Sequence, residues 1–259
     1  MNYCLSVFDE LVYTNIIYKS IQSSHLRQNM SHSTPNRPAD RPTPTVEDYL
    51  MTMHVMERDY GEIIAARLAE MLNVTPATVA MTFKRMERDQ WVVGKGRKGG
   101  VHLTESGRSA AYSVIRRHML AELLLVKLIK VPIAETHNEA HGIEHSISPA
   151  LEERLRKVLG DPEVCPHGNP FPGHEAATSH WIPLTELAAG QKGVIRRIHE
   201  FAEDNHALLG FLVENGIAPG AAAEITEVLP FNQTLTIRIK ERAITLGFQA
   251  ARYIYAEVT

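Results

Sequence analysis

The chain has few of the features that mark secreted or membrane proteins. Its 259 residues include only two cysteines, Cys4 and Cys165, which is too few for a disulfide framework and fits a reducing cytosol. No apolar run reaches the ~18 residues that a membrane span needs. The first thirty residues lack the basic start and small-residue cleavage site of a signal peptide. We therefore expect a folded cytoplasmic protein without a membrane partner.

Basic residues are unevenly distributed along a chain whose net charge is only −3. Residues 75–117 contain nine Lys or Arg and three acids, a local charge of +6, so the remainder carries −9. A basic stretch in an acidic chain is typical of a surface that binds nucleic acid. A solvated charged helix would give the same composition. Sequence motifs are therefore needed to distinguish it from a nucleic-acid-binding surface.

The basic stretch has the pattern of a winged helix-turn-helix. Thr43-Pro44 and Thr75-Pro76 each predict a helix cap followed by proline at the first helical position. The tight turn at Asn73-Val74 separates two short helical stretches. Two β-prone runs around a glycine-rich basic loop follow and predict a hairpin, or wing. Helix, turn, helix and wing in this order indicate DNA binding.

Helices are expected to continue beyond the wing and then to give way to strands. We expect a long helix from Thr104 to about Lys130, a second after Pro132 and a third after Ser148-Pro149. Proline and glycine are frequent in residues 160–180, which predicts a connection. Short β-prone runs and one short helix follow Trp181 and predict a small β-barrel.

Several of the thirteen histidines are grouped with carboxylates at helical spacing. At about 100° per residue, four of these side chains share one narrow face, and a second pair is spaced i, i+4. Imidazole and carboxylate together suit a divalent transition metal. Scattered surface histidines and a helical salt bridge are the alternative explanation. The face of four comprises His137, His141, Glu144 and His145, and the pair is His118 and Glu122.

A second functional class matches part of this helix. The stretch from His141 to His145 fits H-x-x-E-H, in which two histidines bind zinc and the glutamate is the general base of a peptidase. A peptidase also needs a third protein ligand and a substrate cleft, neither of which the sequence indicates. Zinc metallopeptidase therefore stays an alternative.

From about Thr43 to Thr259, the chain resembles the DtxR/MntR family of metal-dependent transcriptional repressors. The motifs that carry the resemblance are, in order, VEDYL, TPATVAMTFKRMERDQWV, LTESGR, RRHMLAELLL, HNEAHGIEHSIS and CPHGNPFPG. The resemblance implies an α+β multidomain fold. Its parts are an N-terminal extension that is disordered or reflects an over-long start (1–42), a winged helix-turn-helix (43–106), a helical metal-binding and dimerisation domain (107–160), a linker (161–180) and a FeoA-like, SH3-like β-barrel (181–259).

The resemblance also implies two metal sites. A primary site would use Asp48, His141, Glu144 and His145. An ancillary site would use His118, Glu122 and His137, joined by Cys165 and His167 from the linker, with Glu203 as a further acidic candidate. His118 could join either site.

The expected primary ligands differ from those of the iron-responsive members and from those of the manganese-responsive members of the family. Iron-responsive members have Met where this chain has Asp48 and Cys where it has His141. Manganese-responsive members share the Asp but often have Glu at the position of Met51, and commonly Glu at that of His141. Because oxygen-rich sites without sulfur lean toward Mn²⁺, we expect Mn²⁺ as corepressor, with Fe²⁺ as the alternative.

The resemblance implies a homodimer that binds a palindromic operator in double-stranded DNA, and a protein that is not an enzyme. The helix that begins at Thr75 would enter the major groove, and basic side chains would contact phosphates. A non-DNA-binding accessory protein of metal transport is a further alternative, suggested only by the FeoA-like part. The expected DNA-contacting residues are Thr75, Ala77, Thr78, Met81, Thr82, Lys84, Arg85, Arg97 and Lys98.

Overall fold

The computed structural model describes residues 41–94 and 100–259. The N-terminal extension predicted for residues 1–42 lies almost wholly outside the described residues, as do Arg97 and Lys98 of the wing. Helices predominate in the first two parts of the chain, and an antiparallel sheet forms the C-terminal part. This segregation confirms the expected α+β class. Among the described residues, no helix is both long and apolar enough to cross a membrane.

The helix-turn-helix forms where the cap and proline signals predicted it. Pro44 opens α2, and Gly61, at φ +75°, ends it in the left-handed conformation that glycine adopts without strain. Thr75 caps α4 by accepting a hydrogen bond from the backbone N–H of Thr78, whereas Thr43 occupies the cap position of α2 without a side-chain bond. The elements of this part are α2 (Pro44–Tyr60), α3 (Ala65–Met71), α4 (Pro76–Arg88), β1 (Val92–Gly94) and β2 (Val101–Leu103).

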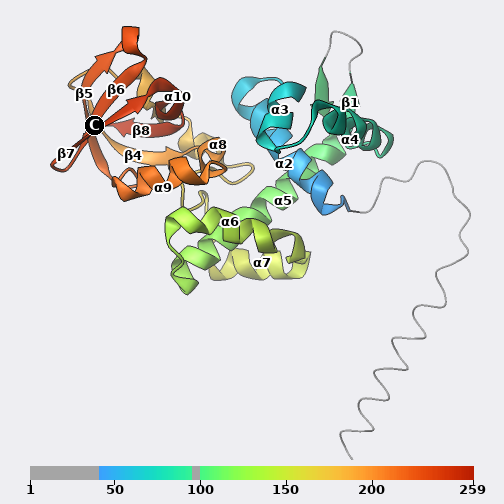
Figure 1. Ribbon diagram of the computed structural model, residues 1–259. Helices are drawn as coiled ribbons and strands as arrows, with labels where there is room; N and C mark the ends of the chain where they lie inside the picture. Colours follow the sequence, from blue (N-terminus) through green and yellow to red (C-terminus); the bar gives the residue numbers. More distant parts are fainter. Residues whose placement is uncertain (1–40, 95–99) are drawn as a thin grey trace, which may run out of the picture. The chain divides into compact units, whose positions relative to one another are not determined.

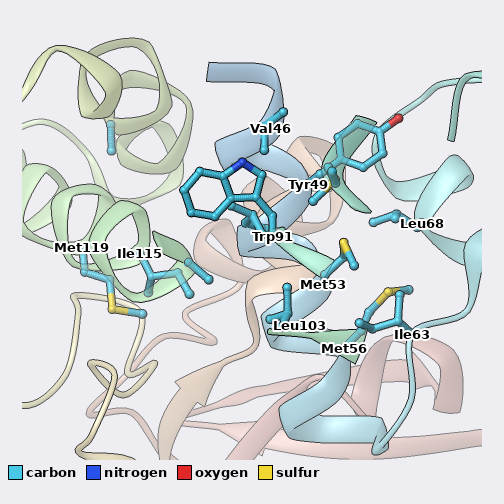
Figure 2. Close-up of a cluster of buried hydrophobic side chains, with 14 of the residues drawn as sticks. Val46, Tyr49, Met53, Met56, Ile63, Leu68, Trp91, Leu103, Ile115 and Met119 are labelled. Atoms are coloured by element: carbon cyan, nitrogen blue, oxygen red, sulfur yellow. The ribbon is translucent and has the colours of Figure 1, made fainter. Parts of the chain in front are cut away.

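One apolar core stabilises this part and extends into the helices that follow. Met53 and Met56 of α2 are fully buried beside Leu68 of α3, and Trp91 packs nearby, as Figure 2 shows. Met119 on the next long helix belongs to the same cluster. Burial of large side chains of this kind contributes roughly 1.5–3 kcal/mol each. The shared core therefore holds α2 between the DNA-binding elements and the helical part.

The helical part is built on one long helix, against which two shorter helices pack (Figure 1). The expected single helix from His137 to His145 is interrupted, because Glu144 and His145 lie in a 3-10 turn rather than in the α-helix. Further along, Ser148 is extended before Pro149 and caps the next helix, so the chain has left helical structure before that residue. The elements are α5 (Glu105–Leu124) with its π-helical end η2 (Leu125–Ile129), α6 (Ile133–Ile143), η3 (Glu144–Ser146) and α7 (Pro149–Val158).

The C-terminal part is a six-stranded antiparallel sheet with its own apolar core. The strand order is β3-β8-β4-β5-β6-β7, and the short helices lie between strands in the sequence. Three β-prone runs and one helix were expected, and the structure adds further strands and two short helices. The elements are β3 (Ile182–Pro183), β4 (Lys192–Ile198), α8 (Glu200–Glu203), α9 (His206–Glu214), β5 (Ala222–Leu229), β6 (Thr234–Ile239), β7 (Arg242–Gly247), α10 (Phe248–Ala251) and β8 (Ile254–Val258).

The connection before this sheet is fixed against strand β4. The Ile198 N–H donates to the carbonyl of His167 at 2.8 Å, and the Asn169 side chain donates to the Ile198 carbonyl at 2.8 Å. Gly168 has φ +88°, and a Cβ at this position would lie 1.9 Å from the carbonyl oxygen of Arg196. Only glycine therefore allows the loop to approach the strand this closely.

Candidate metal centre and nucleic-acid interface

Four side chains from α2, α6 and η3 meet at the junction of the first two parts of the fold. Asp48, His141, Glu144 and His145 each place one donor atom within 4.8 Å of the others. His145 Nε2 lies 3.1 Å from Asp48 Oδ1 and 3.3 Å from Glu144 Oε1, and His141 Nδ1 lies 3.2 Å from the same Glu144 oxygen. These residues are the expected primary ligands, and the structure brings all four together.

The donor set of this primary cluster fits a divalent cation. Asp48 Oδ1 and Glu144 Oε1 are buried, and the imidazole nitrogens 3.1–3.3 Å away do not form aligned hydrogen bonds with them, which leaves both oxygens suited to a cation. Burial raises the pKa of Asp48. Burial also opposes ionisation of Glu144, but the neighbouring imidazoles of His118 and His141 lower its pKa to about 2. Two imidazoles and two carboxylates without sulfur are ligands for a borderline or hard metal ion.

A buried glutamate that the sequence analysis did not identify orients one of these ligands. Glu47 Oε2 lies 2.6 Å from His145 Nδ1, so this ring nitrogen donates to the carboxylate and Nε2 points toward Asp48 and Glu144. The other Glu47 oxygen accepts from Arg117 Nη2 at 2.7 Å, and both side chains are 3% exposed. Burial opposes the charge of Glu47, yet the bonds from His145 and Arg117 lower its pKa. The adjacency of Glu47 to Asp48 was the only available signal in the sequence.

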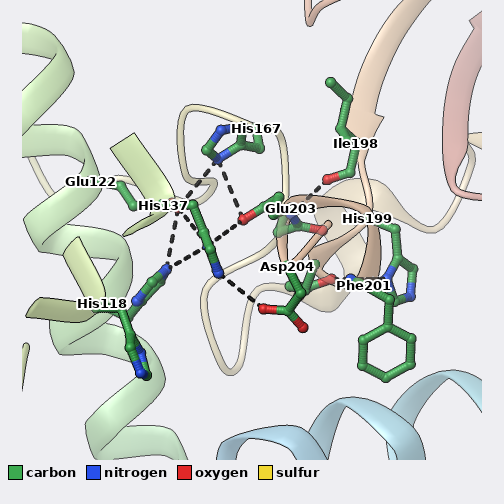
Figure 3. A network of polar contacts seen from close by, with 12 residues as sticks. His118, Glu122, His137, His167, Ile198, His199, Phe201, Glu203 and Asp204 are labelled. Atoms are coloured by element: carbon green, nitrogen blue, oxygen red, sulfur yellow. Dashed lines mark hydrogen bonds and ion pairs between the residues drawn. The ribbon is translucent and has the colours of Figure 1, made fainter. Parts of the chain in front are cut away.

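The ancillary residues form a second, buried cluster, shown in Figure 3. His118 Nε2 lies 3.2 Å from Glu122 Oε1 and 3.1 Å from His137 Nδ1. The C-terminal part contributes as well, because Glu203 Oε2 and Asp204 Oδ1 each lie 3.0 Å from a nitrogen of His137. Glu203 was a candidate from the resemblance, whereas no sequence signal identified Asp204.

The linker ligands Cys165 and His167 lie against this ancillary cluster. Both group with Glu122, and His167 Nδ1 is 3.2 Å from Glu122 Oε1 and 3.4 Å from Glu203 Oε2. Glu122 Oε2 is buried without a hydrogen-bond partner, and His167 Nδ1 forms no aligned hydrogen bond with the carboxylate oxygens near it. Burial raises the pKa of the Cys165 thiol well above its usual range. The residues fit an ion held by imidazole, carboxylate and one thiolate donor.

The negative charges of the ancillary cluster keep its histidines protonated. Burial favours the neutral imidazole, but the Glu122 carboxylate overrides it and raises the pKa of His118 to about 9. Burial is likewise overridden at His167, where Glu203 and Glu122 raise the pKa to about 9. A direct contact joins the two clusters, since His118 Nδ1 lies 2.5 Å from Glu144 Oε2. A metal ion entering the ancillary cluster would therefore replace protons.

A further group of possible ligands, Asp59, His199 and Glu200, contains its own counter-charges. The guanidinium of Arg58 contacts both Asp59 and Glu200, and that of Arg197 contacts them as well. Two cations already neutralise the two carboxylates, so this group is an ion-pair network rather than a metal site.

The second helix of the helix-turn-helix presents the expected DNA-contacting residues. Met81 is 71% exposed, which favours a contact surface over a place in the core. Thr82 is half-buried, and the Thr75 hydroxyl caps the helix, so it is shared with the backbone N–H of Thr78 at 3.1 Å. Arg97 and Lys98 lie outside the described residues. The expected residues that are exposed are Thr75 at the cap and Ala77, Thr78, Met81, Lys84 and Arg85 on α4.

The fold and the two clusters define a winged-helix DNA-binding protein with metal-binding sites. Three family models match the chain: "Iron dependent repressor, N-terminal DNA binding domain" over residues 42–100, "Iron dependent repressor, metal binding and dimerisation domain" over 104–173 and "FeoA domain" over 182–258. The chain belongs to this DtxR/MntR family of metal-dependent transcriptional repressors.

Individual relatives include both iron-dependent and manganese-dependent repressors. The chain is 35% identical to the iron-dependent repressor IdeR of Mycobacterium leprae, covering 82% of this chain and 96% of that protein. A solved manganese-dependent transcriptional repressor in complex with manganese has a TM-score of 0.72 at 26% identity, covering 83% of this chain and 100% of that one. The IdeR structure from T. acidophilum has a TM-score of 0.66 at 29% identity, covering 82% and 97%. These comparisons support a repressor and neither the peptidase nor the transport-accessory alternative.

Proposed function

We propose that the protein is a Mn²⁺-activated repressor, with Fe²⁺ as the second candidate metal. The observation that carries this proposal is the origin of the primary cluster: Asp48 comes from α2, whereas His141, Glu144 and His145 come from α6 and η3. A bound divalent cation would neutralise the two carboxylates and bridge the two parts. The absence of sulfur from this cluster favours Mn²⁺.

Holding α2 in place controls DNA binding through the geometry of a dimer. A dimer reads two half-sites only when its recognition helices have the correct separation and orientation. If α2 is free to shift, the competent arrangement is a minor population and the apparent affinity falls by that fraction. Asp48 and Glu47 anchor α2 to the helical part, and α2 packs with α3 and the core of the helix-turn-helix. A coupling of ~1–3 kcal/mol corresponds to a 5- to 150-fold gain in affinity.

The other finer assignments are also proposals. We propose Asp48, His141, Glu144 and His145 as primary ligands, and His118, Glu122, His137, Cys165, His167 and Glu203 as ancillary ligands. The domain boundaries at residues 106, 160 and 180 stay proposals: the family-model ranges 42–100, 104–173 and 182–258 change near residues 106 and 180, whereas residue 160 lies inside the second range. We further propose a cytoplasmic homodimer that binds a palindromic operator through α4 and the wing.

The ligand Asp48 provides the direct test of this proposal. We expect Mn²⁺ to raise operator affinity of the wild type by about 5- to 150-fold, measured by fluorescence anisotropy, and Asp48→Ala to reduce that gain below about twofold. Glu153→Gln, an exposed acid on α7, is the matched control and should behave as the wild type. Operator binding by the wild type that does not depend on any added metal would refute the corepressor proposal.

The metal preference has a separate test. Asp48→Met/His141→Cys introduces the sulfur donors of the iron-responsive pattern into the primary cluster. Because soft donors disfavour Mn²⁺, this variant should need more Mn²⁺ than Fe²⁺ for half-maximal operator binding under anaerobic conditions. An unchanged order of the two metals would show that these positions do not set the preference.

A further inference from the structure

A network of charged side chains joins the C-terminal end of α2 to the C-terminal sheet. Arg58 contacts both oxygens of Glu200, at 3.0 and 3.1 Å, and both oxygens of Asp59, at 2.7 and 2.6 Å. Two-pronged contacts between a guanidinium and a carboxylate fix orientation as well as distance. The end of α2 is therefore held against α8, which begins at Glu200.

Strand β4 supplies the second cation of this network. Arg197 Nη2 lies 2.9 Å from Glu200 Oε2 and 3.4 Å from Asp59 Oδ2. The next residue but one, His199, donates from Nε2 to Asp59 Oδ2 at 2.7 Å and is 1% exposed. Residues about 140 positions apart thus form one largely buried group, and each carboxylate in it faces two or more donors.

The network continues from Arg197 to the ancillary metal cluster. Arg197 Nε donates to Asn169 Oδ1 at 2.5 Å, and the amide nitrogen of Asn169 donates to Glu203. Asn169 is fully buried two residues after His167, in the loop that strand β4 fixes. Glu203 contacts His137 and His167 within the ancillary cluster, as Figure 3 shows. An unbroken series of polar contacts therefore runs from these ligands to Arg58.

Aromatic side chains add further contacts between the C-terminal part and the helix-turn-helix. Phe201 of α8 stacks on Tyr60, the last residue of α2, with ring centroids 5.9 Å apart and an interplanar angle of 7°. Arg67 of α3 lies over the Tyr60 ring at 4.2 Å and donates to the hydroxyl of Tyr253 at 3.1 Å. The first helix of the DNA-binding pair is thereby held to the sheet as well.

We propose that this series of contacts is a relay that transmits metal occupancy of the ancillary cluster to the DNA-binding helices. The relay comprises Glu203, Asn169, Arg197, Glu200, Asp59 and Arg58, and its role rests on the proposed function. Asp48 anchors one end of α2 at the primary cluster, and Arg58 anchors the other end about 15 Å away along the helix axis. One anchor leaves a helix free to pivot, whereas two anchors fix its direction. Each metal site would thus control a different end of α2.

The relay is tested by removing the Arg58 guanidinium. We expect Arg58→Gln to lower the Mn²⁺-induced gain in operator affinity by about 5- to 10-fold, while the primary cluster still binds Mn²⁺. Because coupling is reciprocal, operator DNA should tighten Mn²⁺ binding to the ancillary cluster in the wild type and no longer in the variant. Anisotropy measures the first effect, and Mn²⁺ titration followed by electron paramagnetic resonance, with and without operator, measures the second. Arg238→Gln, which removes an ion pair with Glu224 within the sheet, is the matched control.

A double-mutant cycle separates a relay from a purely structural contact. Glu203→Gln breaks the other end of the series, so adding Arg58→Gln to it should reduce the Mn²⁺-induced gain by no more than a further twofold. If the double variant instead loses the product of the two single-variant reductions in the Mn²⁺-induced gain, the relay is refuted. If Arg58→Gln does not fold, Arg58→Lys keeps the charge, loses the two-pronged contact and should show the same loss in milder form.

The outcomes distinguish the relay from the proposed function. Full Mn²⁺ activation in Arg58→Gln, alongside activation in the wild type, would overturn the relay alone. Absence of Mn²⁺ activation in the wild type would overturn the proposed function, and with it the relay.

Discussion

Acid should destabilise the DNA-binding part through one buried histidine, His54 of α2. This side chain is 4% exposed, packs edge-on against the Tyr112 ring at 5.0 Å and has no hydrogen-bond partner at Nδ1. Burial, together with the positive charges of Arg58 and Arg108, lowers the pKa of His54 to about 4. The folded protein therefore holds His54 in its neutral form at neutral pH.

The size of the effect follows from proton linkage. Its pKa is about 6.5 when unfolded and about 4 when folded, so the unfolded state binds the proton more readily. The resulting stability is fully present above pH 6.5 and is lost as the pH falls toward 4. One pKa unit corresponds to 1.36 kcal/mol, so the total loss is about 3 kcal/mol. The substitution His54→Phe removes the titrating group and keeps an aromatic ring against Tyr112.

Urea unfolding of the metal-free protein at pH 7.5 and pH 4.5 tests this expectation. A Trp181→Phe background leaves Trp91 as the only tryptophan, and Trp91 is 6% exposed in the same apolar core as α2. Between the two pH values, the parent should lose about 2–3 kcal/mol more unfolding free energy than His54→Phe. Equal pH dependence of the two proteins, within about 0.5 kcal/mol, would refute the assignment of a buried neutral histidine.

Two further substitutions probe the metal-binding parts. Gly168→Ala should abolish metal binding by the ancillary cluster, because its Cβ would overlap a backbone carbonyl of β4; Gly173→Ala, where a Cβ meets nothing within 4 Å, is the control. Calorimetric titration with Mn²⁺ that gives the same stoichiometry for both variants would contradict this expectation. Arg117→Met should lower the free energy of unfolding by about 3 kcal/mol in urea unfolding, since it removes the buried guanidinium that faces the Glu47 carboxylate and leaves it His145 and the half-exposed Arg41. A cost below about 1 kcal/mol would show that other donors replace the guanidinium.

Local signals in the sequence were sufficient for the helix-turn-helix and for the proposed ligands at helical spacing. A Thr-Pro pair specifies a helix start within four residues, as Thr75 and Pro76 do for α4. Helical spacing places His118 and Glu122 on one face of α5, and their ring nitrogen and carboxylate oxygen lie 3.2 Å apart. Such features depend on neighbours within one or two turns, so the sequence alone specifies them.

Features that depend on distant contacts could not be predicted in this way. Helical spacing grouped His137 with the residues around Glu144, but His137 and Glu144 belong to different clusters in the structure. The partner of His137 that completes its environment, Asp204, is 67 residues away. The ion pair between Arg58 and Glu200 spans 142 residues. Neither pairing leaves a periodic signal, because each exists only when separate parts of the fold meet.

The charges of the ancillary cluster explain how the protein can fold before it binds metal. Glu122 and Glu203 are buried, and unpaired buried carboxylates would destabilise the fold by several kcal/mol. Because Glu122 raises the pKa of His118 to about 9, and Glu203 with Glu122 raises that of His167 to about 9, both histidines carry protons at neutral pH and supply the missing positive charge. Metal binding would then replace the protons on these histidines with the charge of the metal ion, in a cluster that has already formed. The metal-free protein can therefore fold, and under the proposed relay metal binding to the ancillary cluster would change the position of α2 rather than fold the chain.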